Sequence, residues 1–189
     1  MGVSPRSEFR NRVELAAYRF ARATVGLGGP GLTDPLGGVL GSLFHRLSRS
    51  RREIVRFNLG LAYPDLSSKE HDRLAVRVGR HFGRTLLGTL RLQRIAPEKL
   101  LNQVTVEGRE HLDDVVHGGY GAFFLSAHLG AWEVAALYAG LTLPGGLGVV
   151  HRPLDNPLLE AELEGFRQRF GNRAIGKEAA LRPILGELK

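Results

Sequence analysis

The sequence predicts an α/β fold in which a mostly parallel sheet is flanked by helices and preceded by a basic helical N-terminal region. Apolar residues recur at helical spacing through the first half, and short apolar runs alternate with helical segments through the second. With 189 residues the chain can bury a hydrophobic core. Only a few strands are predicted before the last residue, which is a thin sheet for this architecture, so we expect the sequence to be truncated.

The first half of the chain is predicted to be helical. Helical patterns cover residues 5–25, 39–62 and 68–94, and a Gly- and Pro-rich stretch over residues 26–38 predicts a break. Ser67 and Glu70 match a capping box at the start of the third helix. The predicted buried stripe of that helix consists of Leu74, Val78, His81, Phe82, Leu86 and Leu90.

Basic charge is concentrated in the same half. Residues 1–95 carry 17 Lys and Arg against 7 Asp and Glu, whereas residues 96–189 carry 9 against 12. Such a surface suits an anionic membrane or nucleic acid, and solvated arginine-rich helix faces are the alternative that needs no partner. The basic half lacks interleaved aromatic residues and a helix-turn-helix pattern, which favours the membrane. We therefore predict a membrane-associated amphipathic region over residues 1–66 and an α/β domain over residues 67–189.

Strands and helices alternate in the predicted second half. Predicted strands cover residues 104–106, 121–126, 147–150 and 174–175, and predicted helices cover residues 110–117, 130–140, 157–170 and 178–188. Between His117 and Arg152 the only charged residue is Glu133. A membrane-spanning helix there would place Glu133 near the bilayer centre, at a cost of about 2.5 kcal/mol or more. Glycines and a proline also interrupt the run, so we predict a buried strand, a turn, a helix and a strand instead.

The string SAHLGAWE, residues 126–133, carries the candidate chemistry. Within one continuous helix His128 and Glu133 would lie about 140° apart and could not meet. A bend at Gly130 would leave His128 before the helix and bring its ring back to Glu133, whose charge the helix N-terminus favours. A carboxylate that accepts one imidazole N–H leaves the other ring nitrogen to take a proton from a hydroxyl. We predict His128 as general base and Glu133 as the residue that orients it, with a chance pairing as the alternative.

A second polar cluster follows the predicted strand 147–150. Arg152 suits a phosphate or sugar oxygen, because its planar fork donates hydrogen bonds in pairs. Asp155 and Asn156 suit the same role or a helix N-cap, and we favour capping for both. His151 is interpreted as a surface residue. No metal or other cofactor is expected, because the chain has no cysteine, no H-E-x-x-H and no P-loop.

These residues resemble a known family. His128 and Glu133 look like the H-x4-D/E box of glycerolipid acyltransferases. The glutamate form, followed by RPLDNP at residues 152–157, is similar to the bacterial lipid A biosynthesis acyltransferases. Further matches follow in family order at residues 56–64 (RFNLGLAYP), 106–112 (VEGREHL) and 167–171 (RQRFG). Ala131 departs from the asparagine that is usual in the family, and the family continues beyond this length with further strands.

The resemblance implies transfer of a fatty acyl chain from acyl carrier protein or acyl-CoA to a lipid A precursor or related glycolipid. It implies work at the cytoplasmic face of the bacterial inner membrane, with the anionic membrane surface as a further partner. It assigns catalysis to His128 and Glu133 and, with the chemistry above, substrate binding to Arg152, Asn156 and Arg167. An arginine-rich nucleic-acid-binding protein and an inactive membrane-docking fragment remain the alternatives.

Overall fold

The structure, a computed structural model, describes residues 6–119 and 121–188 and divides the chain into two compact units. Unit 1 comprises residues 1–20 together with 95–189, and unit 2 comprises residues 21–94. The first helix, α1 (Glu8–Leu27), contributes to both. The predicted boundary between residues 66 and 67 instead falls inside unit 2.

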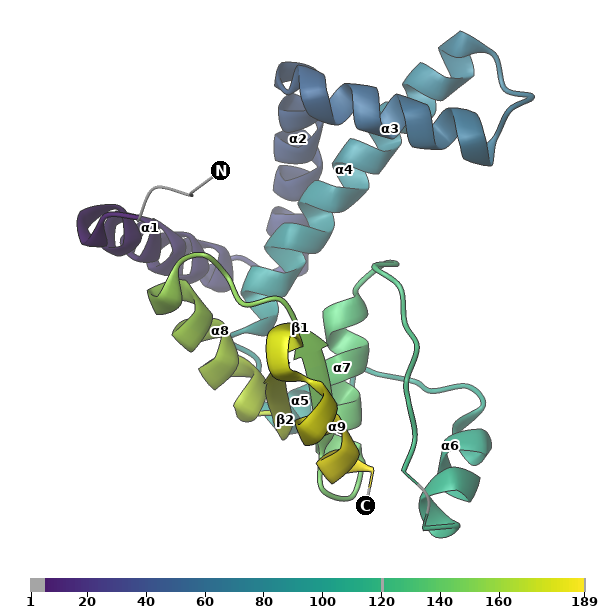
Figure 1. The fold of residues 1–189 in the computed structure, drawn as a ribbon. Helices are drawn as coiled ribbons and strands as arrows, with labels where there is room; N and C mark the ends of the chain where they lie inside the picture. The colour runs from purple at the N-terminus through teal and green to yellow at the C-terminus, as the bar shows by residue number, and fades with distance from the viewer. Residues whose placement is uncertain (1–5, 120, 189) are drawn as a thin grey trace. The chain divides into compact units, whose positions relative to one another are not determined.

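Unit 2 consists of the end of α1 and three further helices (Figure 1): α2 (Pro30–Leu47), α3 (Arg49–Ala62) and α4 (Ser68–Leu92). The predicted break over residues 26–38 is wrong for most of its length, because only Gly28 and Gly29 interrupt the helices. Pro30 occupies the first turn of α2, where a missing N–H costs nothing. A second break, at Ser48, divides the predicted helix 39–62 into two.

The buried side of α4 differs from the predicted one. The capping box is confirmed, since Ser67 and Glu70 each satisfy the backbone N–H of the other. The buried residues of α4 are Ala75, Gly83 and Leu87, however. Of the predicted stripe, Val78, His81, Phe82 and Leu86 are exposed, while Leu74 and Leu90 are half-buried.

Glycines explain why the small residues of α4 are buried. A Cβ added at Gly41 of α2 would overlap the carbonyl oxygen of Gly79, and one added at Gly83 would overlap that of Gly37. The two helices therefore touch backbone to backbone at two levels one turn apart. Leucine or phenylalanine at these positions would hold the helices apart, which is why large side chains occupy other faces.

Unit 1 contains a small parallel sheet between helices, consistent with an α/β fold. Its elements after α1 are α5 (Pro97–Leu101), α6 (Arg109–His117), α7 (Trp132–Thr142), β1 (Leu147–His151), α8 (Pro157–Gln168), β2 (Asn172–Gly176), the 3₁₀ turn η1 (Lys177–Ala179) and α9 (Leu181–Glu187). The strands pair in parallel from Leu147 opposite Asn172 to His151 opposite Gly176. In Figure 1, α7 and α8 lie on opposite sides of this sheet.

The predicted strands at 147–150 and 174–175 are confirmed, and α8 forms the crossover between them. The core of unit 1 is made by large side chains, among them Leu137, Phe166 and Phe170. The two aromatic rings lie edge to face, with centroids 5.4 Å apart.

Two predicted strands are wrong. Residues 104–106 and 121–126 form no strand, and in the described residues β1 and β2 are the strands that pair. Residues 121–129 are exposed throughout, and Leu125 is 101% exposed. An extended segment becomes a strand only when a neighbour satisfies its N–H and C=O groups, so an apolar run alone did not suffice. Within the described part of the chain, no helix has the length and apolar composition needed to cross a bilayer.

Candidate active site

The predicted bend between His128 and Glu133 is present. Gly130 has φ = +56°, in the left-handed region that favours glycine, and α7 begins two residues later at Trp132. His128 therefore precedes the helix, as expected, but at the end of an exposed irregular segment rather than of a buried strand. Its ring packs against that of Trp132, with centroids 4.7 Å apart. The His128 imidazole is thus exposed to solvent just before the start of α7.

Glu133 is held by an arginine. Its side chain, in the first turn of α7, is 13% exposed, and its Oε1 accepts a hydrogen bond of 2.9 Å from Nε of Arg167 in the last turn of α8. The predicted hydrogen bond between His128 and Glu133 is not formed in the described structure. Arg167 takes the carboxylate, and His128 rests on the ring of Trp132 instead.

The ion pair also gives Arg167 a partner within the protein. The sequence predicts Arg167 as a substrate-binding residue, and in this structure its Nε donates a hydrogen bond to Glu133. The guanidinium compensates the charge of a carboxylate that little water reaches. Oε2 of Glu133 accepts no hydrogen bond from any described residue. One carboxylate oxygen is therefore available to a further donor.

Asn156 forms the N-cap of α8 rather than an open binding site. Its side-chain oxygen accepts hydrogen bonds from the backbone N–H groups of Leu158 and Leu159, at 3.0 and 3.3 Å. Its amide nitrogen donates to the carbonyl oxygen of Asn11 and to Glu14. The residue is 2% exposed, and all of its ordinary hydrogen-bonding capacity is used. Capping is confirmed for Asn156, and this structure leaves it no free group for a substrate.

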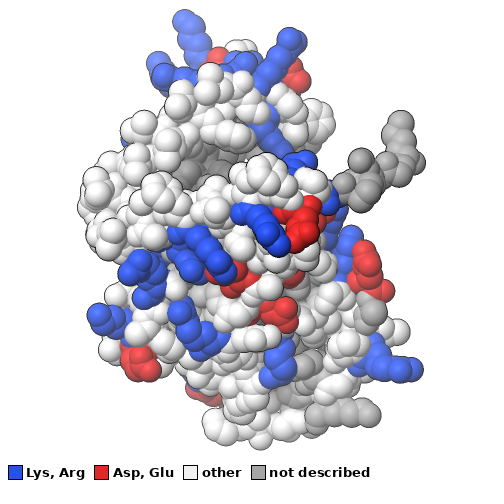
Figure 2. Space-filling view, turned by 90° about the vertical axis from the view of Figure 1, so that its left-hand side faces the viewer, with Lys and Arg blue, Asp and Glu red and all other residues white. Residues whose placement is uncertain are grey.

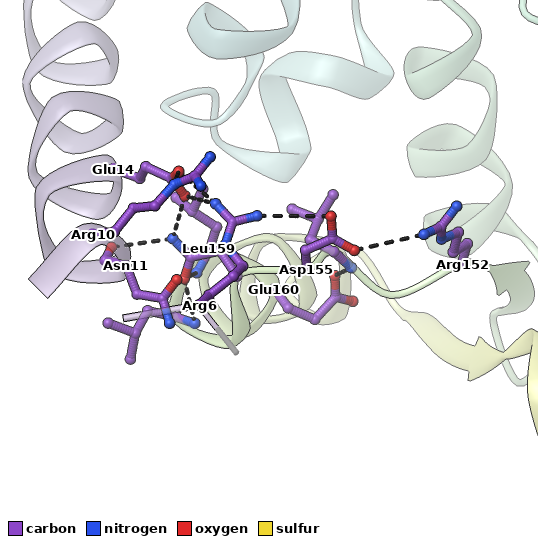
Figure 3. A network of polar contacts seen from close by, with 11 residues as sticks. Arg6, Arg10, Asn11, Glu14, Arg152, Asp155, Leu159 and Glu160 are labelled. Carbon is purple, nitrogen blue, oxygen red and sulfur yellow. Dashed lines mark hydrogen bonds and ion pairs between the residues drawn. The ribbon is translucent and has the colours of Figure 1, made fainter. Parts of the chain in front are cut away.

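A polar network joins the start of α1 to the start of α8 within unit 1 (Figure 3). Glu14 lies at its centre and is bound by Arg6, Arg10 and Asn156. Hydrogen bonds from Asn156 and then Arg10 lower the pKa of Glu14 below its ordinary value. Sequence reasoning missed this network, because residues more than a hundred positions apart gave no local pattern that linked them.

Arg152 is the predicted binding residue that stays open to solvent. It follows β1 directly, at the carboxyl end of the strand, and its side chain is 73% exposed. Its nearest charged partner is Asp155, at 3.6 Å, which also lies 3.7 Å from Arg6. His151 is not the surface residue predicted: its side chain is 16% exposed, and Nδ1 lies 3.5 Å from Glu160.

No cluster suited to a metal ion occurs among residues 6–119 and 121–188. One cavity of about 560 Å³ is lined by Lys177, Glu178, Leu181, Arg182 and Leu185, among others. Another, of about 530 Å³, is lined by residues of α4. His128 lines neither of them.

The fold and the His–turn–Glu segment define a helix-rich α/β protein with an imidazole and a paired carboxylate at the start of one helix. Residues 9–189 match the family described as bacterial lipid A biosynthesis acyltransferase. The chain belongs to this family.

Named relatives agree with this membership. The chain is 32% identical over 154 residues to a lipid A biosynthesis lauroyltransferase of Escherichia coli K12. This match covers 82% of this chain and 49% of the relative. It is 24% identical to lipid A biosynthesis acyltransferase 2 of Shigella flexneri over 85% of this chain and 51% of the relative. It is 23% identical to a lipid A biosynthesis myristoyltransferase of E. coli K12 over 89% and 52%, respectively. The chain thus spans about half the length of these relatives. No solved structure matches it significantly.

Proposed function

We propose that the chain carries the His–Glu part of an acyltransferase that moves a fatty acyl chain from an acyl thioester to a hydroxyl of a lipid A precursor or related glycolipid. The observation that supports this most is the turn at Gly130. It sets the exposed imidazole of His128 ahead of α7, and the first turn of α7 carries Glu133, whose Oε2 accepts no hydrogen bond from a described residue.

In this proposal His128 is the general base. One ring nitrogen removes the proton of the acceptor hydroxyl as its oxygen attacks the thioester carbonyl carbon. The C–S bond breaks, the new ester forms, and the thiolate leaving group takes the proton back from the imidazolium. No acyl-enzyme is needed, because the acceptor attacks the thioester directly.

Glu133 acts by orienting the imidazole through Oε2, while Arg167 keeps Oε1. This role requires the His128 side chain to turn from the ring of Trp132 toward that oxygen. Arg167 is then a positioning residue rather than a substrate ligand. Arg152, exposed at the carboxyl end of β1, is the candidate for an anionic group of a substrate.

The acyl donor is acyl carrier protein or acyl-CoA, and the acceptor lies in a membrane with an anionic surface, at the cytoplasmic face of the bacterial inner membrane. The supporting observations are family membership and the basic charge of residues 1–95, which suits acidic carriers and anionic lipids alike. No step of the proposal uses a cofactor.

Acyl transfer from labelled acyl carrier protein and from acyl-CoA to a lipid A precursor tests the proposal. We expect His128→Ala to lower the rate by a factor on the order of 10² to 10⁴. His111→Ala is the matched control, since this histidine is also exposed and lies outside the proposed site. Equal rates for both variants would refute the role of His128.

Glu133→Gln separates catalysis from structure. If Glu133 orients the imidazole, the variant loses activity while its thermal midpoint moves little more than that of Arg167→Gln, which breaks the same ion pair. A loss of stability with full activity per folded molecule would make the pair structural.

The two rival functions have distinct outcomes. A parent protein that transfers no acyl group but binds anionic vesicles would be the inactive membrane-docking fragment. Binding to duplex DNA in preference to such vesicles at physiological salt would favour a nucleic-acid-binding protein.

A further inference from the structure

The outer side of α2 is a continuous apolar face, here called the α2 face. It consists of Leu32, Leu36, Val39, Leu40, Leu43 and Leu47, each between 44% and 75% exposed. Their spacing of three, four or seven residues places them on one side of the helix. The charged residues of α2, Asp34 and Arg46, fall outside this stripe. An exposed apolar surface of this extent on a helix marks an interaction site.

The opposite side of α2 is already used. Gly37 and Gly41 touch the backbone of α4 there, and Thr33 and His45 are buried on the same side. A helix that packs through glycines leaves its large side chains without a place in the core. The α2 face is therefore not part of the packing between α2 and α4.

α4 carries exposed apolar residues and basic residues on different sides. Val78, Phe82 and Leu86, spaced four residues apart, are exposed on one side. Its opposite side carries Arg73, Arg77, Arg80, Arg84 and Arg91. The pair of helices thus presents apolar and basic surfaces in different directions. Figure 2 shows, in its upper part, a broad area of uncharged side chains below a group of basic ones.

Two arginines lie near the junction of α2 and α3, Arg46 in the last turn of α2 and Arg51 in the first turn of α3. Arg46 and Arg51 form no ion pair with a described acidic residue. Arginines at the edge of an apolar helix face match lipid phosphates beside acyl chains. A second copy of the chain would bring the same arginines and a formal net charge of +7 to the interface, which opposes self-association.

We propose that α2 lies in the plane of an anionic bilayer, with the α2 face among the acyl chains and Arg46 and Arg51 at the phosphates. The inference rests on the proposed function only in taking a membrane as the place of work. It names α2 as the inserted helix, whereas the sequence predicts membrane association for the whole of residues 1–66, with a break over residues 26–38. Vesicle binding is measured without acyl transfer, so either proposal can fail alone.

Matched charge substitutions test the α2 face. Leu43→Glu with Leu47→Glu places two carboxylates on it, and Leu181→Glu with Leu185→Glu makes the same change on α9, where the leucines are also exposed and four residues apart. With vesicles of phosphatidylethanolamine and phosphatidylglycerol, we expect at least about tenfold weaker binding by the α2 variant and little change in the α9 variant. Equal binding of both variants, with circular dichroism unchanged, would overturn the proposal.

A depth measurement keeps the proposal testable if the charged variant misfolds. The chain has no cysteine, so Val39→Cys gives a single labelling site on the α2 face, and Arg80→Cys gives one on the basic side of α4. Lipids brominated in their acyl chains should quench a fluorophore at position 39 but not one at position 80. Vesicle binding without quenching at position 39 would contradict insertion. Vesicle-free dimers that the Leu43→Glu, Leu47→Glu variant dissociates would instead make a second copy the occupant.

Discussion

The α2–α4 pair meets along glycines, whereas large side chains fill the space around β1, α8 and β2. In unit 2, glycines make the closest contacts and large apolar side chains such as Phe82 are exposed. In unit 1, Phe166, Phe170 and Leu137 fill the space between sheet and helices. Hydrophobic periodicity assumes that the largest apolar residues face the core. That assumption holds where side chains fill the core and fails where two backbones meet.

Two phenylalanines give the largest expected contrast. Phe170→Ala removes a fully buried ring from unit 1 and should cost about 3–5 kcal/mol of unfolding free energy. Phe82→Ala removes a ring that is 54% exposed and should cost no more than about 1 kcal/mol. Urea unfolding, followed by circular dichroism and by fluorescence of the single tryptophan, Trp132 in unit 1, measures both. Similar costs would mean that Phe82 is buried and that the glycine packing is wrong.

Two helical glycines give the next contrast. Gly41→Ala drives a methyl group into the backbone of α4 and should destabilise unit 2 by about 1–3 kcal/mol. Gly60→Ala, inside α3 with open space around it, should stabilise the helix by about 0.5–1 kcal/mol. Hydrogen exchange resolved along α2–α4 distinguishes them. Loss of protection in both variants, or in neither, would contradict close contact between α2 and α4.

The elements that local chemistry determines were predictable. The capping box at Ser67, the strands around residues 147–150 and 174–175 and the turn at Gly130 depend on neighbouring residues. The side on which α4 packs was not predictable, because a glycine gives no apolar signal and its partner glycine lies some forty residues away. Residues 121–126 had the composition of a strand but no neighbouring strand among the described residues.

The candidate site divides in the same manner. The position of His128 before α7 follows from the sequence, since Gly130 is two residues away. The ion pair of Glu133 with Arg167 joins the first turn of α7 to the last turn of α8, two helices that lie on opposite sides of the β1–β2 sheet. Long-range geometry thus decided which cation holds the carboxylate.

A smaller difference in stability is expected between substitutions of Asn156 and Asp155, both of which the sequence predicts as caps of α8. Asn156→Ala removes the N-cap of α8 and the hydrogen bond to Asn11, and should cost about 1–2 kcal/mol. Asp155→Ala removes an exposed carboxylate and should change stability by less than about 0.5 kcal/mol. The tryptophan signal during urea unfolding reports both variants. A larger cost for Asp155 would mean that the cap is misassigned.

The smallest expected effect is a pH dependence of stability. It compares His45, which is buried, with His81, which the sequence wrongly predicts to be buried. Burial of His45 on the packed side of α2, with Arg52 and Arg56 nearby, lowers its pKa below the ordinary 6.5. Above pH 6.5 His45 is neutral in both folded and unfolded chains and contributes no pH dependence. As the pH falls below this value the unfolded chain binds a proton that the folded chain resists, so stability decreases until the folded pKa is reached.

His45→Gln should therefore lose less stability on acidification than the parent, as urea midpoints at neutral and mildly acidic pH would show. His81→Gln, on the exposed side of α4, should follow the parent curve. The reverse result would place His81 in the core of unit 2 and His45 in solvent. Such a result would support the buried stripe of α4 that hydrophobic periodicity predicts. It would also mean that the glycine contact between α2 and α4 does not explain why the leucines of α2 are exposed.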